Sequence, residues 1–404
     1  MADLIGFTLI TLVSLLTFFL ALRRKIFSKI LFVALVARIT VLVLGHYFIT
    51  LPDSTADAET FERVAWSLSQ EGFFSLMSNY QGPSARFISW FIAIPYSLFG
   101  RSILMAKSIS LLFGMGSVFL GCLLAEKLWD KRTSVKIGWT IALFPSLILY
   151  SALVMREAYM VFFILIALHG VVNWTKKNNI NSIILALAGF AGGVFFHGAI
   201  LVGAICFAGI VGFSILKKIT KQLINLRFHL QSFLIMIIVI LISGYYFTSK
   251  LNVPYLGNFE SATNIDNLLN KTQNATRGDA AWPEWTKINN PMELIYKSPI
   301  RSIYVVFAPF PWDVKKTKHL IGMFDAFIYF YLTILILQNL KIIWHNPALR
   351  IILLILLTYL FVFGIGVGNF GTGIRHRAKF AILFILLAGP LLKRFIILKK
   401  VIRN

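Results

Sequence analysis

The chain has few charged residues for its length. Only 14% of its 404 residues are Asp, Glu, Lys or Arg, whereas 58% are hydrophobic, and the mean hydropathy is +0.79. A soluble globular chain averages about 25% charged and about 45–50% apolar residues, so this composition points to a lipid solvent. The abundance of apolar residues also excludes intrinsic disorder. Acidic residues are the scarcest, with 16 against 39 Lys and Arg, which gives a net charge of +23.

Cysteine is also scarce, and the motifs of several enzyme classes are missing. Cys122 and Cys206 lie inside apolar runs without metal-type spacing, so they indicate core positions and no redox chemistry. The sequence has no HExxH, no P-loop, and no GxGxxG or GxSxG in the required context. It therefore carries no nucleotide-binding fingerprint. The basic residues punctuate apolar runs and do not form one basic surface, which argues against a nucleic-acid partner.

Long apolar runs are what the sequence does have. A helix needs about 20 apolar residues to cross a bilayer. Eleven runs approach that length and predict an all-α, polytopic transmembrane helix bundle, with residues 1–404 as a single transmembrane domain. The runs are 4–22, 30–50, 102–125, 137–155, 157–174, 180–196, 198–215, 230–247, 322–340, 350–368 and 378–396.

The distribution of Lys and Arg predicts the orientation of the bundle. Alternate connections carry 21 of the 39 basic residues and only two acids, Glu126 and Asp130. Because Lys and Arg accumulate in cytoplasmic loops, we assign this side to the cytoplasm, with the amino terminus outside and the carboxyl terminus inside. Two longer segments, 51–101 and 248–321, then lie outside. Their apolar stretches are short or broken by proline, so we expect them to lie in the interface.

Acidic residues gather in the first external segment, directly after the predicted membrane exit. They include Asp53, Asp57 and Glu59, and from Asp57 apolar residues recur at three- and four-residue steps, which predicts an amphipathic helix. Asp57 then begins that helix, and two interpretations are open. It is either a cap on a solvated acidic face, or a carboxylate at the membrane surface that acts as a general base or metal ligand.

Arg156 and Glu157 stand between two apolar runs with almost no loop. Ionisable residues at membrane depth are costly and mark candidate functional sites. Adjacent residues on a helix point in different directions, so we expect each to face its own partner in a cavity. A simple intramembrane ion pair is the alternative. The predicted topology places both residues at the same membrane face as Asp57.

A basic turn forms the last external connection. Arg375, His376 and Arg377 follow three glycines in the segment GNFGTGIRHRAKF. Arginine presents a fork of donors that suits phosphate oxygens, so we expect a phosphate site here. A patch on lipid headgroups is the alternative, which the predicted topology disfavours because the anionic leaflet is on the other side. His197 and Asp313, at other external turns, are secondary candidates.

The order of these features resembles the GT-C class of polytopic glycosyltransferases, especially the branch of lipid A aminoarabinose transferases and protein O-mannosyltransferases. The resemblance covers residues 30–175, and the rest matches only in layout. It is carried by the order of short motifs: Asp57-Ala-Glu59 leading into FERVAWSLSQEG, then FIAIPYSLFG, LLAEKLWDKR, ALFPSLILYS, and Glu157 at the start of the following span.

The resemblance implies an enzyme of the bacterial cytoplasmic (inner) membrane that works at its outer face. The donor would be a sugar on a polyprenyl phosphate or diphosphate, the acceptor a glycan, lipid or protein, and the anomeric carbon would be inverted. Asp57 would take the proton of the acceptor hydroxyl, and Glu157 would orient a partner or ligate a cation. The donor phosphate would be held by Arg375, Arg377, His376 and Arg156.

Several points stay open in this interpretation. Many relatives have an aspartate where this chain has Arg156-Glu157, so the resemblance does not decide whether Mg²⁺ or Mn²⁺ binds Asp57 and Glu157. A lipid-linked oligosaccharide polymerase or ligase, of the O-antigen or exopolysaccharide type, is the first alternative, because segment 248–321 is long enough to bind a glycan. A lipid or glycan transporter is the second alternative, although the sequence shows no inverted pair of broken helices.

Overall fold

A computed structural model provides the structure of the chain. The residues it describes are helical almost throughout, and the β structure among them is one isolated antiparallel bridge between Ala281 and Asn369. The described residues are 2–55, 57–80, 82, 86–224, 237, 269, 270, 272, 280–314 and 316–392.

Two groups of helices follow each other along the chain. The first is α1 (Ala2–Arg23), α2 (Ser28–Tyr47), α3 (Asp57–Ser69), α4 (Phe73–Ser78), α5 (Phe87–Phe99), α6 (Ile103–Leu128), α7 (Lys131–Leu143), α8 (Pro145–Ser151), α9 (Arg156–Lys177), α10 (Ile180–Phe196) and α11 (Leu201–Ile224). The second is α15 (Pro291–Phe307), α16 (Thr317–Gln338), α17 (Leu340–His345), α18 (Pro347–Gly366), α19 (Phe370–Ala378) and α20 (Ala381–Ala388).

Seven helices among the described residues are long and apolar enough to cross a membrane: α1, α2, α6, α9, α11, α16 and α18. Helices α7 and α8 form an eighth candidate as a pair bent by 55°. The protein is therefore an all-α bundle with several candidate membrane spans, as the sequence predicts. The predicted number of eleven spans is not confirmed.

The remaining three predicted spans have different outcomes. The run 180–196 forms α10, whose 17 residues extend about 25 Å, less than the roughly 30 Å hydrocarbon core. The run 378–396 is interrupted, because α20 is only eight residues long and is followed by a short 3-10 helix, Gly389–Leu391, that contains Pro390. The run 230–247 lies outside the described residues, apart from residue 237.

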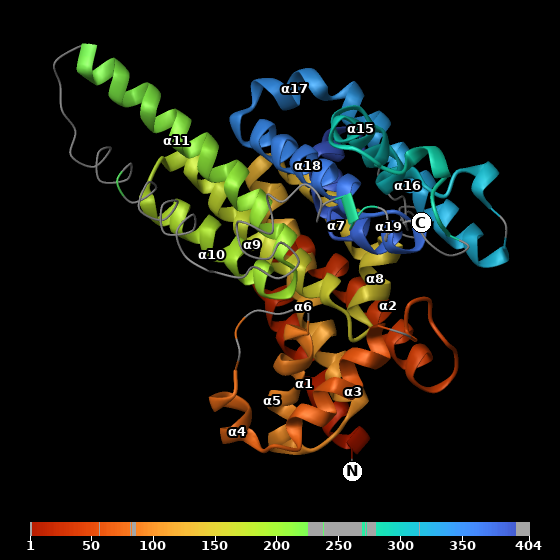
Figure 1. Cartoon of the computed structure of the whole chain (residues 1–404). Coiled ribbons are helices and arrows are strands. Elements are labelled where there is room, and N and C mark those ends of the chain that lie inside the picture. Colours follow the sequence, from red (N-terminus) through yellow and green to blue (C-terminus); the bar gives the residue numbers. More distant parts are fainter. Residues whose placement is uncertain are drawn as a thin grey trace, which may run out of the picture.

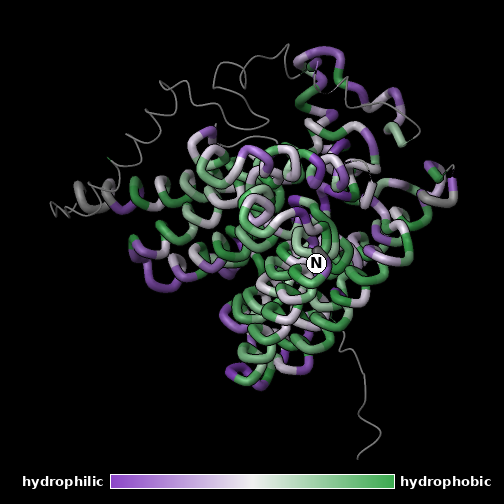
Figure 2. Tube along the Cα trace, turned by 90° about the horizontal axis from the view of Figure 1, so that it is seen from below, coloured by the Kyte–Doolittle hydropathy of each residue, from purple (hydrophilic) through white to green (hydrophobic). Residues whose placement is uncertain are grey.

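The two external segments predicted from the sequence also contain helices. In segment 51–101, α3 packs against α5, and α5 spans the predicted stretch but continues through Pro95. Most of segment 248–321 up to residue 279 lies outside the described residues, and α15 follows, packed along α18. Figure 1 shows α3–α5 at the end of the molecule opposite α15–α18, with α6–α9 between them. Figure 2 shows apolar residues predominating along the central helices.

The bend between α7 and α8 has a cause that the sequence contains. Pro145 has no N–H, so the carbonyl oxygen of Ile141 loses its helical partner. Arg38, on α2 and only 1% exposed, donates from its guanidinium to the carbonyls of Ile141 and Ala142, at 3.3 and 2.8 Å. An arginine buried in this bundle therefore satisfies a helix end, as an unpaired carbonyl there is costly.

Close packing of α9 and α10 depends on small residues. A Cβ added to Gly170 would lie 2.2 Å from the backbone nitrogen of Ala186, and one added to Gly189 would lie 2.3 Å from that of Ala167. Such distances leave no room for any side chain. The two helices therefore approach through their backbones, the usual mode of small residues in membrane bundles.

Candidate functional site

The structure brings the acidic first segment and the basic last turn together. Arg375, on α19, donates to Asp57, the first residue of α3, with a distance of 2.7 Å between Nη2 and Oδ2. The Asp57 side chain is 46% exposed and that of Arg375 only 19%. The carboxylate is therefore accessible to a ligand, whereas the guanidinium is held by its surroundings.

Two further carboxylates lie near the same guanidinium. Burial opposes the charged form of Arg375, but the carboxylates of Glu157, Asp57 and Asp53 raise its pKa above the ordinary value. Asp53 lies in the preceding turn at φ 60° and accepts a 2.7 Å hydrogen bond from the hydroxyl of Tyr150. Burial raises the pKa of Asp53, and Glu157 and Asp57 raise it further, while the Tyr150 hydrogen bond and Arg375 lower it. The acids therefore form one electrostatic cluster around Arg375.

Glu157 occupies the buried side of this cluster. Its side chain and that of Lys379 are almost fully buried, and the Nζ of Lys379 lies 3.6 Å from Oε1, longer than a hydrogen bond. Neither carboxylate oxygen of Glu157 has a hydrogen-bond partner among the described residues. Lys379 instead contacts Nδ1 of His376 at 2.7 Å. The cluster thus retains acceptor capacity in its buried part.

The two histidines and Arg156 complete the cluster. The rings of His197 and His376 meet edge to face with centroids 5.5 Å apart. Burial lowers the pKa of His376, and the cationic Lys379, Arg375 and Arg156 lower it further, together with His197. The guanidinium of Arg156 lies over the ring of Phe61 on α3, 5.1 Å from its centroid. These contacts place both histidines among cations, in which a neutral imidazole is favoured.

The positions of the acidic and basic residues of the cluster at helix ends agree with the helix dipoles. Asp57 begins α3 and Glu157 lies in the first turn of α9, where the helix dipole favours an anion. Arg375 and His376 lie in the last turn of α19, where it favours a cation, and the side chain of Asn369 caps the other end by accepting from the N–H of Thr372. The site is therefore a junction between two helix amino termini and one helix carboxyl terminus.

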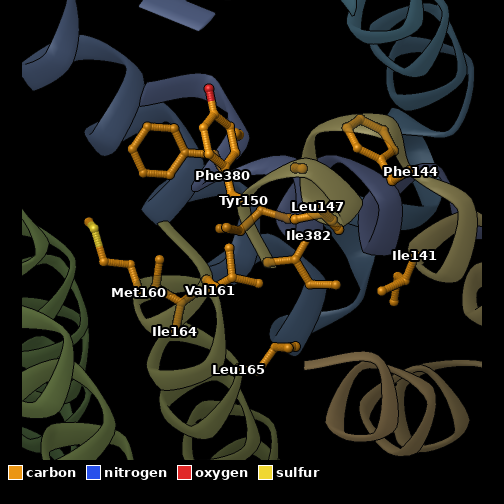
Figure 3. Packing of buried hydrophobic residues seen from close by; sticks show 14 of the residues in the cluster. Ile141, Phe144, Leu147, Tyr150, Met160, Val161, Ile164, Leu165, Phe380 and Ile382 are labelled. Atoms are coloured by element: carbon orange, nitrogen blue, oxygen red, sulfur yellow. The ribbon is translucent and has the colours of Figure 1, made fainter. Parts of the chain in front are cut away.

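Buried apolar side chains and a cavity border the cluster. Figure 3 shows Tyr150 and Leu147 of α8 among other buried side chains, with Ile382 beside Leu147. A cavity of about 430 Å³ lies beside the turn that carries Asp53 and Asp57, and it is lined in part by Glu59. Other lining residues are Ser54, Thr55, Glu62, Lys107 and Val154. Glu59 thus belongs to this neighbouring cavity, while Asp57 pairs with Arg375.

Arg377 has a different role from the phosphate-binding role expected from the sequence. It is completely buried, and its Nε donates to Asp325 on α16 at 2.6 Å. Its other nitrogens donate to the carbonyls of Val306, Ala308 and Gly322 at 2.7–3.0 Å. Each of its three nitrogens is already used, so Arg377 fastens α19 to α15 and α16. Two residues apart on one helix, Arg375 and Arg377 point to different surroundings.

Asp313 also departs from expectation. It accepts from the backbone N–H of Phe310 at 3.1 Å and so caps the short 3-10 helix Pro311–Asp313 in its own loop. This local cap gives Asp313 a structural role.

The predicted metal ligands do not fit a prepared cation site. Asp57 is paired with Arg375, and Glu157 faces Lys379, so a positive charge already stands beside each carboxylate. Among the described residues, no group of three or more His, Cys, Asp or Glu side chains has an arrangement that could hold a metal ion. We therefore derive no step through Mg²⁺ or Mn²⁺.

Two residues of this region are not expected from the sequence. Tyr150 lies within an apolar run and Asp325 stands alone in another, so periodicity gives neither of them a role. The one usable signal is that a lone acid inside a span, such as Asp325, requires a buried partner. Which of the basic residues supplies it depends on helix packing.

Comparison of the sequence with protein families and curated proteins gives no relative. The chain matches no protein-family model, and no curated protein matches its sequence. The resemblance to GT-C enzymes therefore stays a prediction from the motifs and from the order of features along the chain.

Proposed function

We propose that the protein is a membrane glycosyltransferase that transfers a sugar from a polyprenyl-phosphate-linked donor to an acceptor hydroxyl at the outer face of the bacterial cytoplasmic membrane. The observation that carries the proposal is the 2.7 Å contact between Asp57 and Arg375. These residues are more than 300 positions apart, and the resemblance to GT-C enzymes implies the role of general base for Asp57 and of phosphate ligand for Arg375. A transferase needs both groups within reach of one anomeric carbon.

The reaction follows from the chemistry of the two groups. The acceptor oxygen attacks the anomeric carbon and forms the new glycosidic bond, while its proton passes to the Asp57 carboxylate. The bond between the anomeric carbon and the phosphate oxygen breaks, and its electron pair stays on the polyprenyl phosphate. Arg375, with Arg156 nearby, stabilises the charge that develops on this leaving group. Atoms and charge balance without an added cofactor.

The ion pair couples donor binding to the availability of the base. In the free protein the guanidinium of Arg375 donates to the carboxylate of Asp57 at 2.7 Å. The phosphate of the sugar donor offers Arg375 several oxygens. The Nε of Arg375 is buried and has no hydrogen-bond partner among the described residues, so this N–H is available to bond a phosphate oxygen. When the phosphate takes over the guanidinium, Asp57 is released toward the acceptor. In this proposal the base becomes free only when the donor is present.

Release of the lipid carrier tests the proposal without knowledge of the sugar. Purified protein is incubated with a panel of polyprenyl-phosphate-linked hexoses and simple glycan acceptors, and the polyprenyl phosphate formed is measured. We expect Asp57→Asn to slow its release by about 10²–10⁴-fold, the usual contribution of a general base. Glu71→Gln is the matched control, because Glu71 lies in the same segment, is exposed, and accepts a hydrogen bond from exposed Asn79. Equal rates for Asp57→Asn and the wild type would refute the role of Asp57.

The products also separate the alternatives. A single added sugar and a released monophosphate support a transferase of the proposed type. A ladder of products with released polyprenyl diphosphate would indicate a lipid-linked oligosaccharide polymerase or ligase. Movement of an unchanged lipid or glycan across liposomes, with no release of carrier, would indicate a transporter.

A further inference from the structure

Two cavities lie along α1, α6 and α9, and the second of them lies at the other end of α9 from Glu157 and the cluster around Arg375. We call the two cavities together the groove. One part is a cavity of about 400 Å³ with an apolar lining, which includes Leu16, Leu112, Phe113, Gly116 and Phe162. A second part, of about 580 Å³, is lined by Leu120, Leu123 and Ile166, and at its end by Arg24, Glu126, Lys127, His169 and Asn173.

The two cavities follow the same faces of the same helices. On α6 the lining residues 112, 116, 120, 123 and 127 are spaced by three or four positions, and on α9 the residues 162, 166, 169 and 173 are spaced likewise. Such positions form one continuous face of a helix. From residue 112 to residue 127 the face extends about 22 Å, the length of a lipid chain with its headgroup in one leaflet.

The polar end of the groove carries more positive than negative charge. Lys127 contacts Nδ1 of His169 at 3.3 Å and Oδ1 of Asn173 at 3.1 Å, so its ammonium is bound by neutral groups. The ammonium of Lys176 donates to the carbonyl of Lys127 and brings a second charge to the same place. The acid of the lining, Glu126, lies 3.7 Å from Arg24.

Helix dipoles account for only part of this arrangement. Lys127 and Lys176 lie in the last turns of α6 and α9, and cations are favourable at the carboxyl terminus of any helix. A dipole effect does not require a hollow beside these lysines, nor an apolar continuation of it along the same helices. A ligand with an anionic head and a hydrocarbon chain explains both features together.

We propose that this groove binds one anionic glycerophospholipid, with its phosphate near Lys127 and an acyl chain along Phe113 and Phe162. Charge complementarity selects the occupant, because the ammonium of a choline headgroup would meet Lys176 and Lys127. Basic pockets between membrane helices at the cytoplasmic side are known binding sites for anionic headgroups. The orientation predicted from the loop charges places this end of the bundle there.

Lipid retention by the purified full chain tests the proposal. Delipidated protein is mixed with phosphatidylglycerol or phosphatidylcholine of identical acyl chains, and bound lipid is counted by native mass spectrometry. We expect preferential binding of phosphatidylglycerol, and Lys127→Gln to weaken that binding about fivefold, the effect of one lysine at a headgroup. Binding of phosphatidylcholine should not change. Lys131→Gln is the control, because Lys131 is an exposed lysine of the next helix outside the groove.

A second variant acts on the chain end of the groove. Leu16 lines the apolar cavity from α1 and is 45% exposed, so Leu16→Trp adds bulk to the groove from a lipid-facing position. Leu16→Trp should weaken binding of both lipids. If Lys127→Gln does not fold, Leu16→Trp by itself tests whether the groove binds lipid. Equal effects of Lys127→Gln and Lys131→Gln would overturn the proposal, as would unchanged binding in Leu16→Trp. Preferential retention of polyprenyl phosphate over phosphatidylglycerol would overturn the assignment of a glycerophospholipid as the ligand of the groove.

Discussion

Arg377→Met should destabilise the fold, whereas Arg375→Met should impair activity and leave the fold intact. Both arginines lie on α19, two residues apart, and the sequence alone assigns them the same role. The structure separates them, because Arg377 is completely buried and Arg375 faces accessible Asp57. The pair of variants therefore compares the same substitution in two surroundings.

The magnitude follows from what Arg377→Met leaves behind. The variant loses the 2.6 Å bond to Asp325 and strands a carboxylate whose side chain is only 10% exposed. Breaking one partner of a buried ion pair costs about 3–5 kcal/mol. The carbonyls of Val306, Ala308 and Gly322 also lose their donor, so the loss in free energy of unfolding should reach at least the lower end of that range. A loss of about 3 kcal/mol changes the ratio of folded to unfolded protein by more than a hundredfold.

Thermal unfolding in detergent, followed by the fluorescence of the nine tryptophans, is the assay. We expect the apparent Tm to fall in the order wild type, Arg375→Met, Arg377→Met, with the first two close together. Adding Asp325→Leu to Arg377→Met should recover part of the loss, because it removes the stranded charge. An Arg377→Met protein as stable as Arg375→Met, or no recovery in the double variant, would refute the structural role of Arg377.

Three further predictions use other contacts. Arg38→Met should lower the free energy of unfolding by about 1–3 kcal/mol, since two carbonyls at the bend between α7 and α8 lose their donor; an unchanged unfolding midpoint in detergent would contradict this. Glu62 is buried and accepts from Arg101 at 2.8 Å, so Arg101→Ala, which strands the carboxylate, should lower the apparent Tm more than Glu62→Gln does. A lower apparent Tm for Glu62→Gln than for Arg101→Ala would contradict the prediction that the stranded carboxylate is the costly partner. Carrier release should persist in excess chelator, because Asp57 and Glu157 already face cations; its loss on chelation and return with Mg²⁺ or Mn²⁺ would show that a metal takes part.

Local patterns were sufficient for most of the helices. Apolar runs of about 20 residues predict α1, α2, α6, α9, α11, α16 and α18, and the amphipathic spacing after Asp57 predicts α3. Span length was less predictable, because α10 and the segment around α20 are apolar but short. Their burial comes from neighbouring helices, and composition does not separate a buried short helix from a complete span.

The candidate site was predictable in its residue types but not in its partners. The sequence singles out Asp57, Glu157 and Arg375 because charge is rare in an apolar chain, and the structure places them in one cluster. The sequence does not distinguish the role of Arg375 from that of Arg377, and it gives no partners for Arg38 or Arg301. Arg301 is fully buried and donates to the carbonyls at the end of α18. An arginine that binds carbonyls and one that faces a carboxylate have the same local sequence signal.

By itself, the sequence determined that this protein is a helical bundle suited to lipid, and that its few acids and its last basic turn carry information. These properties depend on composition and on spacing along one chain, which are local. Only the tertiary structure decided which arginine meets which acid. That choice depends on which helix ends lie together in a medium where every unpaired charge or carbonyl is costly, so the packing of α3, α9 and α19 assigns the partners.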